Sequence, residues 1–141
     1  MPGVVLDTHA LIWLVTEPEN LTNESLVGIA EAQVAGKLFV SPITAWELAI
    51  AVSKKNNAPN LGDVPVKDWY RAAIAQIGAK VVPINASIAL ESANMITQTN
   101  HRDPGDCYLI STAKYKKASL ITRDEKIRNI AATGYIDVIV C

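Results

Sequence analysis

The sequence has no long hydrophobic run, no surplus of basic charge and few cysteines. Its first apolar run, Val4 to Val15, contains Asp7 and His9 and is too short to cross a bilayer, so we expect no targeting or membrane-spanning segment. The only cysteines, Cys107 and Cys141, form no CxxC or Cys/His zinc pattern, which favours a reducing cytoplasm. A net charge of −1 excludes a polybasic nucleic-acid binder, so contact with nucleic acid must be local or depend on a cation.

What the sequence does contain is enough apolar material for one core. Half of its 141 residues are hydrophobic, and no repeat, low-complexity tract or linker divides them, so we predict a single domain over residues 1–141. Short β-branched runs alternate with longer stretches of helical periodicity. This pattern predicts an α/β fold in which helices cover both faces of a parallel sheet.

The predicted elements follow from periodicity and from turn residues. Strands are predicted over residues 4–6, 37–41, 80–84, 119–122 and 135–140. One helix is predicted to begin after Asp7 and to stop before Pro18, and the others are predicted over residues 21–35, 42–53, 66–77, 86–97, 106–117 and 125–132. Pro83 interrupts the third strand and places it at an edge of the sheet. Three tryptophans at helical spacing are predicted to lie in the core: Trp13, Trp46 and Trp69.

Four acidic residues lie where predicted strands end or in the helices beside them: Asp7, Glu47, Asp106 and Asp124. Ligands of open parallel sheets collect at the carboxyl ends of the strands, so these side chains share one crevice if the first and fourth strands are neighbours. Two unit charges ~4 Å apart repel by about 4 kcal/mol at an effective dielectric near 20, so a cation must offset them. A ligand set made only of oxygen atoms suits Mg²⁺ or Mn²⁺.

Such a site predicts metal-assisted hydrolysis of a phosphodiester by in-line attack of water, without a covalent intermediate. Arg102 and Arg123 are the cations nearest to the acidic positions in sequence and are predicted to contact phosphate. Thr122, at the end of the fourth strand, is a further candidate for substrate binding. His9 and His101 are left out, because an isolated histidine is more often structural.

Each acidic residue also has a purely structural interpretation. Asp7 and Asp124 could merely cap the helices that follow them. Asp103 precedes Pro104 and is predicted to be an N-cap, which places Asp106 in the first turn of its helix. Glu47 could face solvent.

Four blocks of sequence resemble PIN-domain proteins, and especially the VapC-type toxins: LDTHALIW at 6–13, SPITAWELAI at 41–50, HRDPGDCYLISTA at 101–113 and LITRDEKI at 120–127. The resemblance implies a PIN-like three-layer α/β/α sandwich with five parallel strands, a Mg²⁺ or Mn²⁺ site and cleavage of RNA. It implies that Asp7, Glu47, Asp106 and Asp124 hold the metal, with Asp103 as an outer acidic member. It also implies a homodimer and a cognate antitoxin whose tail enters the acidic groove.

The chain departs from the family pattern in one block. Family members commonly read DPFDR where this chain reads DPGDC at residues 103–107. Gly105 therefore replaces an aromatic group, and Cys107 replaces a cation beside the site.

Our leading hypothesis is a metal-dependent endoribonuclease, the toxin of a type II toxin–antitoxin module, that cleaves single-stranded or structured RNA. The second is a PIN-like RNA-binding module with little or no turnover, and a housekeeping ribonuclease is a variant of the first. A phosphotransfer receiver or aspartate-nucleophile phosphatase is disfavoured, because Asp7-Thr8-His9 lacks the paired DxD arrangement and Glu47 would have no role. Specificity for a target RNA depends on the shape of the groove that receives its bases.

Overall fold

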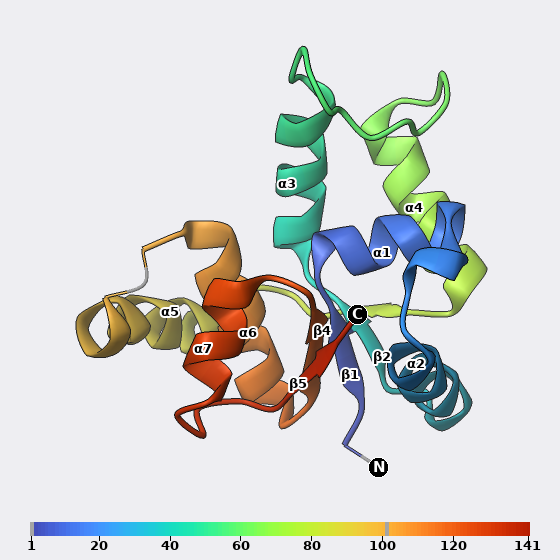
Figure 1. Ribbon diagram of the computed structural model, residues 1–141. Coiled ribbons are helices and arrows are strands. Elements are labelled where there is room, and N and C mark those ends of the chain that lie inside the picture. Colours follow the sequence, from blue (N-terminus) through green and yellow to red (C-terminus); the bar gives the residue numbers. More distant parts are fainter. Residues whose placement is uncertain (1, 101) are drawn as a thin grey trace.

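The core of the molecule is a sheet of five parallel strands (Figure 1). The structure is a computed structural model, and it describes residues 2–100 and 102–141. The strands are β1 (Val4–Leu6), β2 (Leu38–Val40), β3 (Lys80–Val81), β4 (Ser119–Thr122) and β5 (Val138–Val140). Their order across the sheet is β3-β2-β1-β4-β5. This confirms the predicted parallel sheet, with β1 beside β4 and β3 at an edge.

Helices cover both faces of this sheet (Figure 1). They are α1 (Thr8–Thr16), α2 (Asn23–Ala35), α3 (Pro42–Val52), α4 (Val66–Ile77), α5 (Ala86–Thr99), α6 (Pro104–Lys116) and α7 (Glu125–Ala131), and a 3-10 turn, η1 (Pro18–Asn20), follows α1. Helices α5, α6 and α7 lie on one side, and α1, α2 and α4 on the other, while α3 rises beyond the sheet (Figure 1). The result is the predicted α/β/α sandwich.

Alternation along the strands builds two separate cores. Val4 and Leu6 pack with α1, α2 and α4, whereas Val5, between them, packs with α5, α6 and α7. Both sides of a strand are therefore buried, which explains why β1 and β2 read as continuous apolar runs. Among the described residues, no helix combines the length and the hydropathy that crossing a membrane requires.

The ends of several elements differ from the predictions. β3 stops at Val81 instead of residue 84, because Pro83 has no N–H with which to continue the ladder. β5 begins only at Val138, after a turn in which the N–H of Gly134 donates to the carbonyl of Ala131. Helix α6 begins two residues earlier than expected, at Pro104. The remaining boundaries shift by one or two residues, as fraying ends allow.

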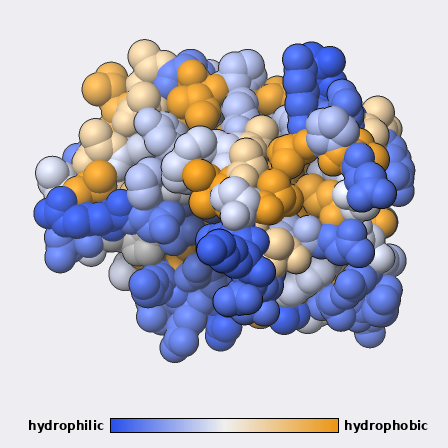
Figure 2. Space-filling model, turned by 90° about the horizontal axis from the view of Figure 1, so that it is seen from above, coloured by the Kyte–Doolittle hydropathy of each residue, from blue (hydrophilic) through white to orange (hydrophobic). Residues whose placement is uncertain are grey.

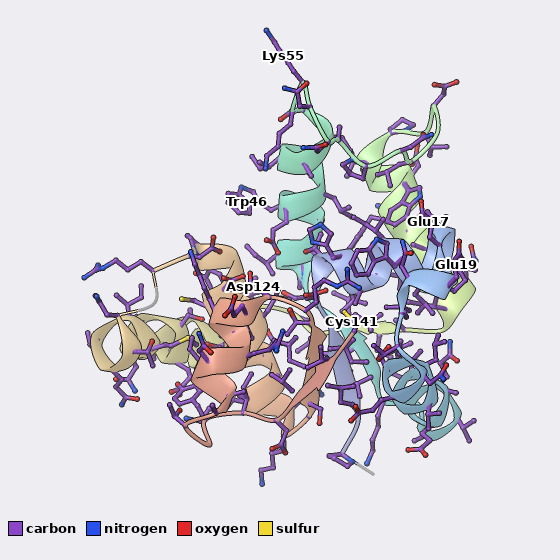
Figure 3. The ribbon with its side chains drawn as sticks, viewed as in Figure 1. Glu17, Glu19, Trp46, Lys55, Asp124 and Cys141 are labelled. Carbon is purple, nitrogen blue, oxygen red and sulfur yellow. The ribbon has the colours of Figure 1, made fainter. Side chains whose placement is uncertain are left out.

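One of the three tryptophans is not in the core. Trp69 is buried and Trp13 is half-buried, but Trp46 is 52% exposed. Trp46 projects from the side of α3 that faces away from α4 (Figure 3). The prediction for Trp46 was wrong because helical spacing fixes which residues share a face and not whether that face is covered.

Gly3, just before β1, lies close to the backbone of Lys37, just before β2. Its φ is +94°, and a Cβ there would lie 2.6 Å from the carbonyl oxygen of Lys37. We expect Gly3→Ala to lower the free energy of unfolding by roughly 2–4 kcal/mol, from the positive φ together with the clash. Gly134→Ala is the control, since its φ is +85° with nothing within 4 Å of the added Cβ, and it should cost about 1 kcal/mol. Equal losses in chemical denaturation would show that crowding at Gly3 has no effect.

Candidate active site

An acidic cleft of about 710 Å³ opens at the carboxyl ends of β1 and β4. Six carboxylates line it: Asp7, Glu47, Asp103, Asp106, Asp124 and Glu125. Three side chains of opposite charge share the lining: Lys54, Arg123 and Lys126. All five predicted acidic residues thus meet in one place, although they come from α1, α3, α6 and α7 and the turns before them.

Asp7 is the most enclosed of these carboxylates. Its backbone N–H donates to the carbonyl of Ile121 in β4, and its Oδ1 accepts the N–H of Ala10 at 2.7 Å, which caps α1. The side chain is only 7% exposed. Burial raises the pKa of Asp7, and the charge of Asp124 raises it further, while the hydroxyl of Thr122 and the N–H of Ala10 act in the opposite direction.

Asp124 and Asp103 cap helices in the same manner. Asp124 Oδ1 accepts the N–H groups of Lys126 and Ile127 at 2.8 and 3.3 Å, and its own N–H donates to the hydroxyl of Thr122. Asp103 Oδ1 accepts the N–H of Asp106 at 3.0 Å. The capping interpretation is therefore confirmed for Asp7, Asp124 and Asp103. It does not compete with a role in the cleft, because the same three side chains line it.

Glu47 faces the cleft and not the solvent. Its Oε1 accepts a hydrogen bond of 2.8 Å from the hydroxyl of Thr8, which joins α3 to the start of α1. Burial raises the pKa of Glu47 to about 6, and the charges of Asp106, Asp103 and Asp7 add to this rise. The carboxylates of α1, α3 and α6 are therefore near enough to repel one another.

Gly105, at a position where the PIN-domain proteins that the sequence resembles commonly carry an aromatic residue, lies directly against the Glu47 carboxylate. A Cβ at this position would be 2.6 Å from Oε2 and 2.8 Å from Cδ of Glu47. The departure from the family pattern thus makes room for Glu47. The Glu47 carboxylate lies between the hydroxyl of Thr8, which donates to it, and the backbone of Gly105, and these two contacts fix its position.

The carboxylates of the cleft are donors of the type that a hard divalent cation prefers. Mg²⁺ and Mn²⁺ prefer oxygen ligands, and the charged side chains that approach one another here are carboxylates. Within residues 2–100 and 102–141, however, no group of three Asp, Glu, His or Cys side chains is placed so that it could hold a metal ion. The N–H of Ala10 and the hydroxyl of Thr8 each occupy one oxygen atom of Asp7 and Glu47, respectively, through a hydrogen bond. Burial raises the pKa values of Asp7 and Glu47, so a nearby positive charge would stabilise their ionised forms.

The three residues predicted to contact substrate are placed differently from the carboxylates. Arg102 is exposed and is not part of the cleft lining. Thr122 is fully buried, so its hydroxyl positions Asp7 and Asp124 instead of reaching a substrate. Arg123 lines the cleft, but its guanidinium donates to the carbonyls of Cys141 and Asn20 and lies 4.1 Å from the centre of the Trp13 ring.

Several functional candidates were missed by the sequence reasoning. Thr8 positions Glu47, and His9, Lys54 and Lys126 line the cleft. A signal existed for Thr8 and His9, because they follow Asp7 directly at the end of β1. Lys54 carried none, since it follows the end of α3 and reaches the cleft only through the way α3 packs. His101 lies outside the described residues.

Comparison with known proteins agrees with this fold. Ribonuclease VapC22 of Mycobacterium tuberculosis is 26% identical over 129 residues, which cover 92% of each chain. Among solved structures, VapBC2 of Rickettsia felis bound to a promoter DNA fragment superposes with a TM-score of 0.68 at 13% identity, covering 97% of both chains. FitAcB of Neisseria gonorrhoeae gives a TM-score of 0.61 at 21% identity, covering 96% of both chains. The sequence model of the PIN domain matches residues 4–133, and the chain therefore belongs to the PIN-domain family.

Proposed function

We propose that this protein is a Mg²⁺- or Mn²⁺-dependent endoribonuclease that cleaves single-stranded or structured RNA and acts in the cytoplasm as the toxin of a type II toxin–antitoxin module. The observation that carries the proposal is the convergence of Asp7, Glu47, Asp103, Asp106 and Asp124 on one cleft of a PIN fold. The relative from Mycobacterium tuberculosis is named a ribonuclease, which supports the activity. We take residues 1–141 as one PIN domain.

The proposed roles follow from burial and position. Asp7, Asp106 and Asp124, with Glu47 and Asp103 beside them, would hold the metal ion. When bound, such an ion polarises a phosphoryl oxygen and lowers the pKa of a water ligand. Glu47 is suited to accept a proton from the attacking water, because burial raises its pKa to about 6. Lys54 and Lys126 supply local positive charge for the RNA backbone.

A protein partner is also part of the proposal. Several structural neighbours are toxin–antitoxin complexes, among them one from Klebsiella pneumoniae with a TM-score of 0.59 at 21% identity. Hydrophobic patches lie between hydrophilic ones on the face seen from above (Figure 2). Trp46 and Ile50 on α3 are among the exposed hydrophobic side chains, and an apolar pocket lies between α3 and α4. These surfaces support a homodimer and a cognate antitoxin as partners.

The charge of Asp7 can be removed with little effect on the fold. Asparagine caps a helix as well as aspartate does, so Asp7→Asn keeps the acceptor for Ala10 and loses only the charge. We expect Asp7→Asn and Asp106→Asn each to lower the rate of RNA cleavage in Mg²⁺ or Mn²⁺ by roughly a hundredfold or more. Sequencing of new RNA ends from a pool of cellular RNAs measures the effect.

Asp137→Asn is the matched control, because Asp137 is exposed and outside the cleft lining. It should leave the rate unchanged. Cleavage that persists in both cleft variants would come from a contaminant or from another site. Binding of RNA without cleavage by the wild-type protein in either metal would favour the binding module.

The raised pKa of Glu47 makes a prediction about stability. Its folded-state pKa of about 6 exceeds the ordinary 4.5, so its stabilising contribution is complete below pH 4.5 and is lost as the pH rises through 6. Without metal at neutral pH, Glu47→Gln should raise the melting temperature by roughly 3–6 °C, and below pH 4.5 it should not. Mg²⁺ should stabilise the wild type more than this variant, because it binds only the folded state.

Glu91→Gln is the control, because the pKa of Glu91 is lowered whereas that of Glu47 is raised. Hydrogen bonds from Lys114 and Tyr135 lower the pKa of Glu91, which lies outside the cleft lining, so its charge is stabilising at neutral pH. This variant should melt at a lower temperature than the wild type and respond to Mg²⁺ as the wild type does. A lower melting temperature for Glu47→Gln at neutral pH would contradict the proposed repulsion.

Gly105 offers a way to displace Glu47 without altering a carboxylate. In Gly105→Ala the new Cβ occupies the space of Oε2, so the carboxylate must leave its place beside Thr8. We expect cleavage to slow roughly ten- to a hundredfold. Gly28→Ala is the control, since it places the same methyl group in a helix against a single side-chain atom of Ile139 at 3.2 Å. Equal activity of both variants would exclude a role for the position of Glu47.

A further inference from the structure

A second groove, of about 780 Å³, continues from the acidic cleft. The two share four lining residues: Thr8, His9, Trp13 and Lys54. From these the second groove runs between α1 and the segment that joins α3 to α4, which forms an arch above α1 (Figure 1). None of the five cleft carboxylates of the proposed metal site lines this second groove.

One face of helix α1 lines this groove along its length. Its lining residues form two rows spaced four apart, Thr8-Ile12-Thr16 and His9-Trp13-Glu17. Asp124 and Glu17 lie toward opposite ends of α1 (Figure 3). A chain that passes through the acidic cleft can therefore continue along α1 without leaving the protein surface.

The floor of the groove offers aromatic rings at its junction with the cleft. The His9 and Trp13 rings lie 5.6 Å apart at an interplanar angle of 54°. The Arg123 guanidinium covers Trp13 at 4.1 Å and is fixed there by the carbonyls of Cys141 and Asn20. Because Arg123 occupies one face of Trp13, an unpaired base would stack on the opposite face of Trp13 and against the His9 ring.

The opposite wall offers amides. Asn56, Asn57 and Asn60 line the groove from the arch. An asparagine side chain both donates and accepts hydrogen bonds, so it can match the edge of a base. Asn57 has a φ of +59°, a conformation that costs energy for a residue other than glycine and that tends to persist at functional sites. Asn60 uses its Oδ1 to accept the N–H of Gly62, which orders the arch.

We propose that this groove binds one unpaired base of the RNA, that of the nucleotide next to the scissile phosphate. The base stacks at His9 and Trp13, Asn56 and Asn57 contact its edge, and Lys54, which lines both spaces, contacts the phosphate between them. The inference rests on the proposed nuclease function and adds the element that selects a sequence.

The chemistry of the lining favours a base over the tail of a protein partner. Among the described residues, the groove is lined by three asparagines, two threonines, the rings of His9 and Trp13, the charged side chains of Lys54 and Glu17, and four apolar residues, Ile12, Ala51, Ala58 and Pro59. The apolar face of a helix would need a continuous hydrophobic floor, whereas polar side chains interrupt the apolar residues of this groove; the pocket between α3 and α4 is the more apolar of the two. Base edges need paired donors and acceptors beside a stacking surface, which this groove provides.

Asn57→Gly is the test variant, because glycine keeps the positive φ and removes only the amide. Asn100→Gly is its matched control, since Asn100 has a φ of +58° and lies outside the groove. Asn56→Ala tests the neighbouring amide without changing a special conformation. Cleavage of a random-sequence single-stranded RNA pool in Mg²⁺ gives the base preference on each side of the cut. Fluorescence anisotropy of the same labelled pool, measured in an Asp7→Asn background, gives affinity without cleavage.

We expect Asn57→Gly and Asn56→Ala to reduce the preference for one base beside the cut by about three- to tenfold, with a similar loss of affinity, while Asn100→Gly changes neither. Cleavage with an unchanged preference in both groove variants would overturn this inference and leave the nuclease proposal intact, and the groove would then be open to a protein partner. Affinity that falls in the groove variants of a protein that never cleaves RNA would support the base site and refute the nuclease. Absence of any RNA affinity would overturn both.

Discussion

The parallel pairing of β1 with β4 is the constraint on which the site depends. The N–H of Asp7 completes this ladder by donating to the carbonyl of Ile121 at 3.1 Å. It thereby sets Asp7 beside Thr122, whose hydroxyl also accepts the N–H of Asp124. Two turns far apart in sequence are joined by backbone geometry, so the repulsion between their carboxylates is opposed by the whole sheet and not by a flexible loop.

Helix capping stabilises the negative charge of three of the carboxylates that lie close together in the cleft. Asp7, Asp103 and Asp124 accept N–H groups at the starts of α1, α6 and α7, and the positive end of a helix dipole favours a negative charge. Glu47 lies at no helix end; the hydroxyl of Thr8 donates to it and lowers its pKa, but burial outweighs this and raises the pKa to about 6. The capping hydrogen bonds therefore serve both purposes: they begin the helices, and they hold the three carboxylates in the cleft.

Short buried strands and the residues at their ends leave local signals, so the sequence predicted the layers, the parallel sheet and four acidic side chains, while the resemblance added Asp103. It did not predict what depends on packing between distant elements. The exposure of Trp46 depends on what covers α3, and the burial of Thr122 depends on β4 lying between β1 and β5. The engagement of Arg123 requires Trp13, Asn20 and the backbone of Cys141, which no spacing in the sequence relates.

These contacts also bear on the cation that family members carry where this chain has Cys107. The Cys107 thiol is buried, and burial raises its pKa, so it brings no charge to the cleft. Arg123 does not replace the missing cation, because its guanidinium is held against Trp13 by two carbonyls. The other positive side chains of the cleft lining are Lys54 and Lys126, both exposed and both on flexible stems. A phosphate in this cleft would therefore be held mainly by a metal ion, and Lys54 at the junction of cleft and groove would link that contact to the choice of base.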